Sequence, residues 1–153
     1  MKPKKVAIGN DHRGVQLKKE LIVELKKHGY SVQDVGVNTE DSCDYPDYAA
    51  KVGLAVQKGE ADRGIVICHS GIGMSIAANK IKGVRAALCQ TKEAAELARK
   101  HNDANVLAMG SGFVKLDLAK TIALTFLSME FEGDRHERRV KKISQYERQN
   151  LCE

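Results

Sequence analysis

The sequence predicts one α/β domain spanning residues 1–153: a three-layer α/β/α sandwich around a Rossmann-like five-stranded parallel sheet, with an extra C-terminal helix. Two observations predict this class. Short apolar runs without polar alternation recur along the chain, and a longer amphipathic segment follows each of them. Strands that are apolar throughout are typical of a sheet covered on both faces, and right-handed crossovers place the helices there. No linker, repeat or low-complexity stretch divides the chain.

The individual elements follow from these runs. Strands are expected at residues 5–9, 30–36, 63–68, 84–89 and 104–110. Helices are expected at residues 15–29, 45–59, 73–81, 91–101, 116–131 and 134–149. Start and stop signals support these boundaries: Gly29 and Gly59 end two helices, Pro46 lies near the start of one, and Thr91 is an N-cap. Ligands of such sheets bind beyond the carboxyl ends of the strands.

Composition excludes several classes of partner. Lysine and arginine number 25 against 20 acidic residues, a net charge of +5, and part of the excess lies near the C-terminus. Aromatic residues make up only 5%, with no arginine-rich or stacking motif, so nucleic acid is not an expected partner. No apolar run approaches the roughly 20 residues that span a membrane. A small anionic ligand needs only a few of these charges.

The N-terminus and the cysteines predict a cytoplasmic protein without a metal. The first residues, MKPKKVAIGNDH, become polar too early for a signal peptide. Cys43, Cys68, Cys89 and Cys152 form neither a C-x-x-C pair nor a zinc-like spacing. We therefore expect reduced thiols in the cytosol.

The stretch CHSGIGMS, residues 68–75, is a glycine-bearing turn between a strand and a helix. Its backbone N–H groups and the helix N-terminus favour an anion, and the same location stabilises a thiolate, so Cys68 is a candidate base or nucleophile. The spacing is not that of a Walker loop, and a dinucleotide fingerprint would follow the first strand. The alternative is a tight turn around a buried, inert thiol.

Three further groups have a functional and a structural interpretation. Asp11 and His12 follow the first strand, either as sugar and phosphate ligands or as a helix cap and a solvent-facing histidine. His101, with Asn102, ends a helix, where it is either a stabilised cation or a group that moves protons.

Arg135 and Arg139 share one helical face, which suits a phosphate but is also common on a solvated helix. The stretch EDSCDYPDYA needs only capping and turn roles, and Cys43 receives no function.

Several segments together resemble, in order and spacing, the type B ribose-5-phosphate isomerases. They are GNDHRG, DYPDYA, GEADRGIVIC followed by HSGIGMSIAANKIKGVRAALC, ARKHNDANVLAMG and FEGDRHERRV. The family includes galactose-6-phosphate and allose-6-phosphate isomerases, and the resemblance runs from about Lys5 to about Ile143. It implies an aldose–ketose isomerase that converts a phosphorylated sugar through an enediolate without a metal or organic cofactor. It also implies a homodimer or homotetramer whose pockets lie between subunits.

The resemblance assigns a role to each matching residue. Cys68 would move the proton between C1 and C2, Ser70 would assist ring opening or relay a proton, and His101 would open the furanose. The backbone N–H groups of Gly71, Ile72, Gly73 and Met74 would stabilise the enediolate oxygen. Asn102 and Asp11 would hold the sugar, and His12, Arg135 and Arg139 would hold the phosphate.

The sequence departs from the family pattern beside this motif. His69 stands in place of a glycine, and it either tunes Cys68, reshapes the sugar pocket or points away. Gly112 stands where an arginine is common, and Arg13 where alanine is common, so we expect Arg13 to replace the missing phosphate ligand. Ribose 5-phosphate is the expected substrate. Hexose 6-phosphate isomerisation, a non-catalytic sugar-phosphate binding protein and a nucleotide- or flavin-binding module are the alternatives.

Overall fold

The computed structural model describes residues 3–150, so Cys152 lies outside the described part. Its five strands are β1 (Lys5–Asn10), β2 (Ser31–Asp34), β3 (Arg63–Cys68), β4 (Ala86–Leu88) and β5 (Val106–Gly110). They form one parallel sheet in the order β2-β1-β3-β5-β4. The predicted α/β class and the parallel five-stranded sheet are confirmed.

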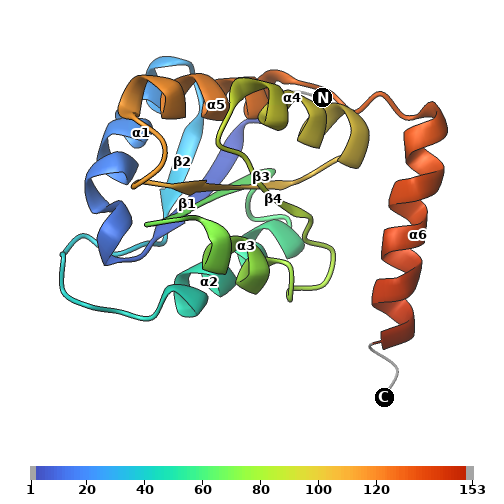
Figure 1. The fold of residues 1–153 in the computed structure, drawn as a ribbon, viewed down its shortest axis with the longest axis horizontal. Coiled ribbons are helices and arrows are strands. Elements are labelled where there is room, and N and C mark those ends of the chain that lie inside the picture. Colours follow the sequence, from blue (N-terminus) through green and yellow to red (C-terminus); the bar gives the residue numbers. More distant parts are fainter. Residues whose placement is uncertain (1–2, 151–153) are drawn as a thin grey trace.

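Helices cover both faces of this sheet (Figure 1). One layer contains α1 (Val15–Lys27), α4 (Lys92–Asn102) and α5 (Leu116–Ser128), and the other contains α2 (Tyr45–Gln57) and α3 (Ile72–Ala78). A short 3₁₀ turn, η1 (His12–Gly14), precedes α1. The last helix, α6 (Asp134–Asn150), packs against α4 and stands to one side of the three layers (Figure 1). No helix within residues 3–150 is long and apolar enough to cross a membrane.

The central strand β3 shows why the apolar runs lack alternation. Ile65 and Ile67 pack into the core on the α1, α4 and α5 side, whereas Val66 and Cys68 pack into the core beneath α2 and α3. Successive side chains point to opposite faces of a strand, and here both faces are buried. Cys68 therefore ends β3 on the α2 and α3 side of the sheet.

Among the strands, the boundaries differ most at the two sides of the sheet. The outer strands β2 and β4 are shorter than the predicted 30–36 and 84–89. Their side chains are mostly half-buried or exposed, so an apolar pattern is a weaker guide there. The predicted Thr91 cap is confirmed, because its Oγ1 accepts the Ala94 N–H at 3.1 Å.

Candidate active site

The turn after β3 fixes the Cys68 side chain at the carboxyl edge of the sheet, which is the edge where the parallel strands end. Cys68 is only 5% exposed, and its Sγ accepts the Gly71 N–H at 3.1 Å. Gly71 has a φ of +77°, and a Cβ there would lie 2.7 Å from the Met109 carbonyl carbon. Only glycine fits that backbone conformation beside β5. The thiol is thus held at the start of α3 by a turn that other residues would disrupt.

The same turn presents a hydroxyl and backbone donors. Ser70 Oγ accepts the Ile72 N–H at 3.2 Å. The first bond inside α3 joins the Ser75 N–H to the Gly71 carbonyl, so the Gly73 and Met74 N–H groups precede it.

Tyr45 from α2 lies directly against this turn, and sequence analysis gave it no role. A Cβ on Gly73 would lie 2.5 Å from its Cζ atom. The segment DYPDYA belonged to the resemblance, but only the fold places the Tyr45 ring over the Gly73 backbone.

A second thiol, that of Cys89, is also buried. Cys89 follows β4 and is 1% exposed, and burial raises its pKa to about 12. That thiol stays protonated at neutral pH, so it has the inert character that the structural interpretation allowed for Cys68.

Asp11 and His12 follow β1, next to the end of β3. The Asp11 N–H donates to the Ile67 carbonyl at 3.1 Å, and its carboxylate caps η1 by accepting the Arg13 N–H at 2.9 Å. The capping interpretation of Asp11 is therefore confirmed, and a sugar-binding role for the same buried carboxylate remains a prediction.

His12 has a partner that the sequence did not reveal. The Cys43 backbone N–H donates to His12 Nδ1 at 3.3 Å, and the Cys43 Sγ lies 3.8 Å from the same nitrogen. With Nδ1 accepting, the neutral ring carries its proton on Nε2 and can donate it to a ligand. The structure thus places the loop at Cys43 against the His12 ring through a backbone N–H, and the expectation that the Cys43 thiol has no function stays a prediction.

Arg13 lines a groove to which His12 does not contribute. Its exposed side chain lines a groove of about 450 Å³ between α1 and the start of α5, together with Gln16, Glu20 and Lys115. Its carbonyl accepts the Ser111 hydroxyl at 2.9 Å. The structure thus groups Arg13 with Lys115, and its role as a phosphate ligand stays a prediction.

His69 and Gly112, two residues that depart from the family pattern, lie against each other, and the His69 ring fills the space beside Gly112. A Cβ on Gly112 would lie 2.3 Å from His69 Cε1, and the His69 ring also meets Phe113 edge-on at 5.9 Å between centroids. The backbones are joined as well, since the Gly112 N–H donates to the His69 carbonyl at 2.9 Å. The His69 ring therefore points toward Gly112 over the seam between β3 and β5, where a larger residue 112 would displace it.

His101 and Asn102 lie at the amino edge of the sheet, where the parallel strands begin. They end α4, and the loop after them leads to Val106, the first residue of β5. Cys68, by contrast, pairs with Gly110, the last residue of β5. A parallel strand rises about 3.3 Å per residue, so the two edges are about 13 Å or more apart. One chain therefore does not bring His101 to Cys68.

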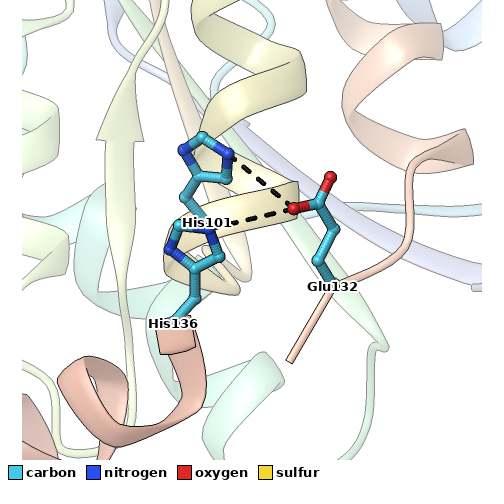
Figure 2. Close-up of side chains that lie close together, drawn as sticks. All are labelled: His101, Glu132 and His136. Carbon is cyan, nitrogen blue, oxygen red and sulfur yellow. Dashed lines mark ion pairs between the residues drawn. The ribbon is translucent and has the colours of Figure 1, made fainter. Parts of the chain in front are cut away.

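His101 belongs to a cluster with His136 and Glu132 (Figure 2). The His101 and His136 rings stack with centroids 4.0 Å apart, and Glu132 Oε2 lies 3.9 Å from His101 Nε2 and 3.8 Å from His136 Nε2. Burial, and next the charges of His101 and Arg135, lower the pKa of His136. Sequence analysis missed Glu132 and His136, although both lie in the segment FEGDRHERRV that carried the resemblance.

Arg135 and Arg139 are exposed residues of α6 beside this cluster. Their positive charges act on His136, which lies on the neighbouring buried face of the helix. The amino edge thus gathers His101, Asn102, Arg135 and Arg139, and the carboxyl edge gathers Asp11, His12, Cys68 and Ser70.

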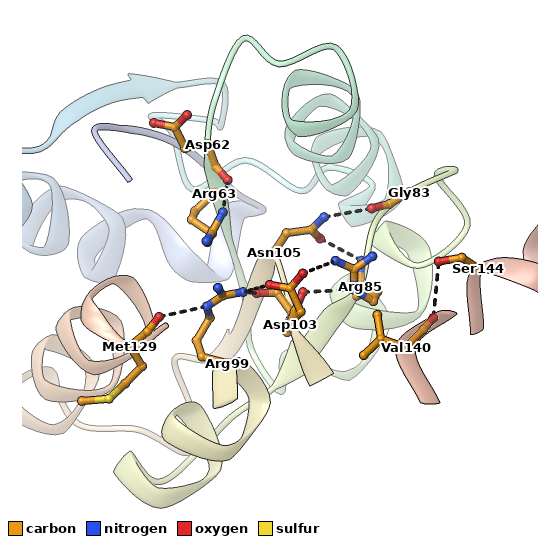
Figure 3. Close-up of polar contacts among 11 residues, drawn as sticks. Asp62, Arg63, Gly83, Arg85, Arg99, Asp103, Asn105, Met129, Val140 and Ser144 are labelled. Atoms are coloured by element: carbon orange, nitrogen blue, oxygen red, sulfur yellow. Dashed lines mark hydrogen bonds and ion pairs between the residues drawn. The ribbon is translucent and has the colours of Figure 1, made fainter. Parts of the chain in front are cut away.

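An ion-pair network holds the loop after His101 in place (Figure 3). Asp103 has a φ of +46°, and its carboxylate pairs with Arg99 at 2.9 Å and with Arg85 at 3.1 Å. Asn105 accepts the Arg85 N–H at 2.8 Å and donates to the Gly83 carbonyl at 2.8 Å. In the motif HNDAN, therefore, Asp103 and Asn105 shape the loop, while His101 and Asn102 precede it.

Comparison with known proteins gives a consistent result. The family model described as Ribose/Galactose Isomerase matches residues 6–143. Ribose-5-phosphate isomerase B of Escherichia coli is 49% identical over 144 residues, covering 94% of this chain and 97% of that protein. Ribose-5-P isomerase B of Listeria innocua is 40% identical over 146 residues, covering 95% and 99%.

Solved structures agree. Ribose-5-phosphate isomerase B of Clostridium thermocellum superposes with a TM-score of 0.94 at 52% identity, covering 95% of this chain and 99% of that one. The Thermotoga maritima enzyme gives 0.90 at 47% identity, covering 93% and 98%. The chain belongs to the ribose/galactose isomerase family.

Proposed function

We propose that the protein interconverts ribose 5-phosphate and ribulose 5-phosphate, with Cys68 as the base. The observation that carries this proposal is the Cys68 thiol, held at the start of α3 by the Gly71 N–H, in a chain whose relatives are named ribose-5-phosphate isomerase B. A donor directed at sulfur stabilises negative charge there.

The proton transfer can be written from this geometry. The Cys68 thiolate takes the proton from C2 of the open-chain aldose, and the electrons of the broken C–H bond form the enediolate. The Ser70 hydroxyl relays the proton between the two oxygens, and the thiol returns its proton to C1. The Gly73 and Met74 N–H groups stabilise the enediolate oxygen. Because the hydrogen moves within the substrate, the reaction needs no organic cofactor.

The proposal includes a homodimer or homotetramer with shared sites. His101 and Asn102, assigned to ring opening and sugar binding, lie at the opposite sheet edge from Cys68, as do Arg135 and Arg139. A two-fold axis can place the amino edge of one subunit against the carboxyl edge of its partner. His12 of one subunit and the two arginines of the other would then hold the phosphate. Free thiols at Cys43, Cys68 and Cys89 support a cytoplasmic location.

The substrate is tested by offering ribose 5-phosphate and allose 6-phosphate separately to the purified protein and measuring each ketose. We expect turnover of the pentose. Preference for the hexose would support hexose 6-phosphate isomerisation, the second candidate, which the unusual pair of His69 and Gly112 favours. Activity on neither, with sugar phosphate still bound by Cys68→Ala, would support a binding protein.

The shared site is tested by mixing two inactive variants, Cys68→Ala and His101→Ala. In a mixed dimer one site carries both changes and the other carries neither, so random exchange of subunits restores about a quarter of the wild-type activity. The control is each variant taken alone through the same exchange procedure. No recovery, with exchange verified by mass spectrometry, would contradict a site made by two subunits.

A further inference from the structure

The cluster of His101, Glu132 and His136 has the composition of a metal site. The three side chains come from the end of α4, the segment after α5 and the start of α6, and their ligand atoms all lie within 4.8 Å of one another. Two imidazole nitrogens and one carboxylate oxygen are ligands that Zn²⁺ accepts in sites that keep an open position.

A buried nitrogen points into this cluster without a partner. His136 is 6% exposed, and its Nε2 has no hydrogen-bond partner among the described residues. The 3.8 Å to Glu132 Oε2 is too long for a hydrogen bond. Buried polar atoms in native proteins are nearly always satisfied, so an unmet nitrogen indicates that something binds there.

The distances suit a shared ion. Ligand atoms around a tetrahedral zinc ion, at about 2.0–2.1 Å from the metal, lie about 3.3 Å from one another. The two nitrogen–oxygen distances of 3.8 and 3.9 Å therefore need only a small contraction. The rings are nearly parallel, at 11°, so one must rotate for both nitrogens to face the ion. His101 is about one-third exposed and has room to do so.

We propose that His101, Glu132 and His136 bind one divalent transition-metal ion such as Zn²⁺, and that the bound ion inhibits the isomerase by occupying His101. The inhibitory part rests on the proposed function, and the binding part does not. Arg135 and Arg139 bring positive charge to the site. Because this charge repels a cation, we expect the affinity for Zn²⁺ to be only micromolar. Mg²⁺ prefers oxygen ligands and should not compete.

Binding is tested by titrating Zn²⁺ into the full chain in a calorimeter at one fixed pH. We expect one ion per chain, and at least about tenfold weaker binding in Glu132→Gln and in His136→Gln. Glu132 is exposed, so its variant should fold even if His136→Gln does not. The matched control is His28→Gln, which should leave the affinity unchanged, because His28 is an exposed residue that caps the end of α1 and lies 3.6 Å from Glu24.

Co²⁺ separates this site from the free thiols. Nitrogen and oxygen ligands give the visible bands of cobalt without a thiolate-to-metal charge-transfer band. A strong charge-transfer band, binding that Glu132→Gln retains in full, or no binding would overturn the metal site. For inhibition, we expect Zn²⁺ to lower turnover and EDTA to restore it. Zinc that binds without lowering turnover would overturn only the inhibitory role.

Discussion

The two edges of the sheet carry different kinds of chemistry. At the carboxyl edge, Cys68 and Ser70 lie in a glycine turn that is packed against β5 and Tyr45 and uses backbone N–H groups. At the amino edge, imidazole and guanidinium groups project from α4 and α6, and ion pairs hold the loop between them and β5. Under the proposed function, the first edge would move the proton and the second would bind charged groups of the substrate. Because the two edges lie at opposite ends of the strands, the proposed site needs residues from two subunits.

The largest expected effect is at the carboxyl edge. Cys68→Ala should lower kcat by roughly 10²–10⁴, the usual contribution of a general base, because alanine cannot take the proton. Steady-state kinetics measure this. The matched control is Cys89→Ala, whose thiol is buried and protonated, and whose kcat should stay near wild type. Equal losses in both variants would mean that Cys68 acts through packing.

At the amino edge the expected loss is in stability. Asp103→Ala should lower the free energy of unfolding by about 2 kcal/mol, because it leaves the buried Arg99 without its carboxylate. Urea unfolding measures this. Asp103→Asn keeps a residue that tolerates the positive φ and should lose about half as much. If the two variants lose the same free energy of unfolding, the charge of Asp103, and not its backbone conformation, accounts for the loss of stability.

A smaller effect is expected where His69 covers Gly112. Gly112→Ala should displace the His69 ring, costing about 1 kcal/mol of stability and changing KM for the sugar phosphate. In the double variant His69→Gly with Gly112→Ala the space is free, so the alanine should cost almost nothing. Additive losses in this double-mutant cycle would show that the two positions are independent.

The smallest expected effect is a pH dependence. The pKa of His136 lies below its ordinary value of 6.5, mainly because the ring is buried. As the pH falls below the ordinary value, the unfolded chain takes up a proton that the folded chain resists, so the free energy of unfolding decreases. Urea unfolding at about pH 7.5 and about pH 5.5 should show a smaller decrease for His136→Asn than for wild type. An equal decrease would assign the pH dependence to other groups.

Local patterns were sufficient for much of the fold. The unalternating runs identified the central strands β1, β3 and β5, and the Thr91 cap was found because capping depends only on neighbouring residues. The edge strand β4 was predicted too long, because it pairs with β5 only over Ala86–Leu88 and the apolar pattern continues beyond that pairing. The contact between Cys43 and His12 was missed because His12 precedes Cys43 by 31 residues and only the loop after β2 brings them together.

The sequence by itself determined the parallel sheet, the glycine turn that holds Cys68 and the family to which the chain belongs. It did so because strand and helix periods, caps and turns depend on residues close together in the chain. The tertiary structure alone decided that β5 lies between β3 and β4, that His69 lies over Gly112, and that His101 joins Glu132 and His136 away from Cys68. Those relations depend on the order of strands in space, which differs from their order along the chain.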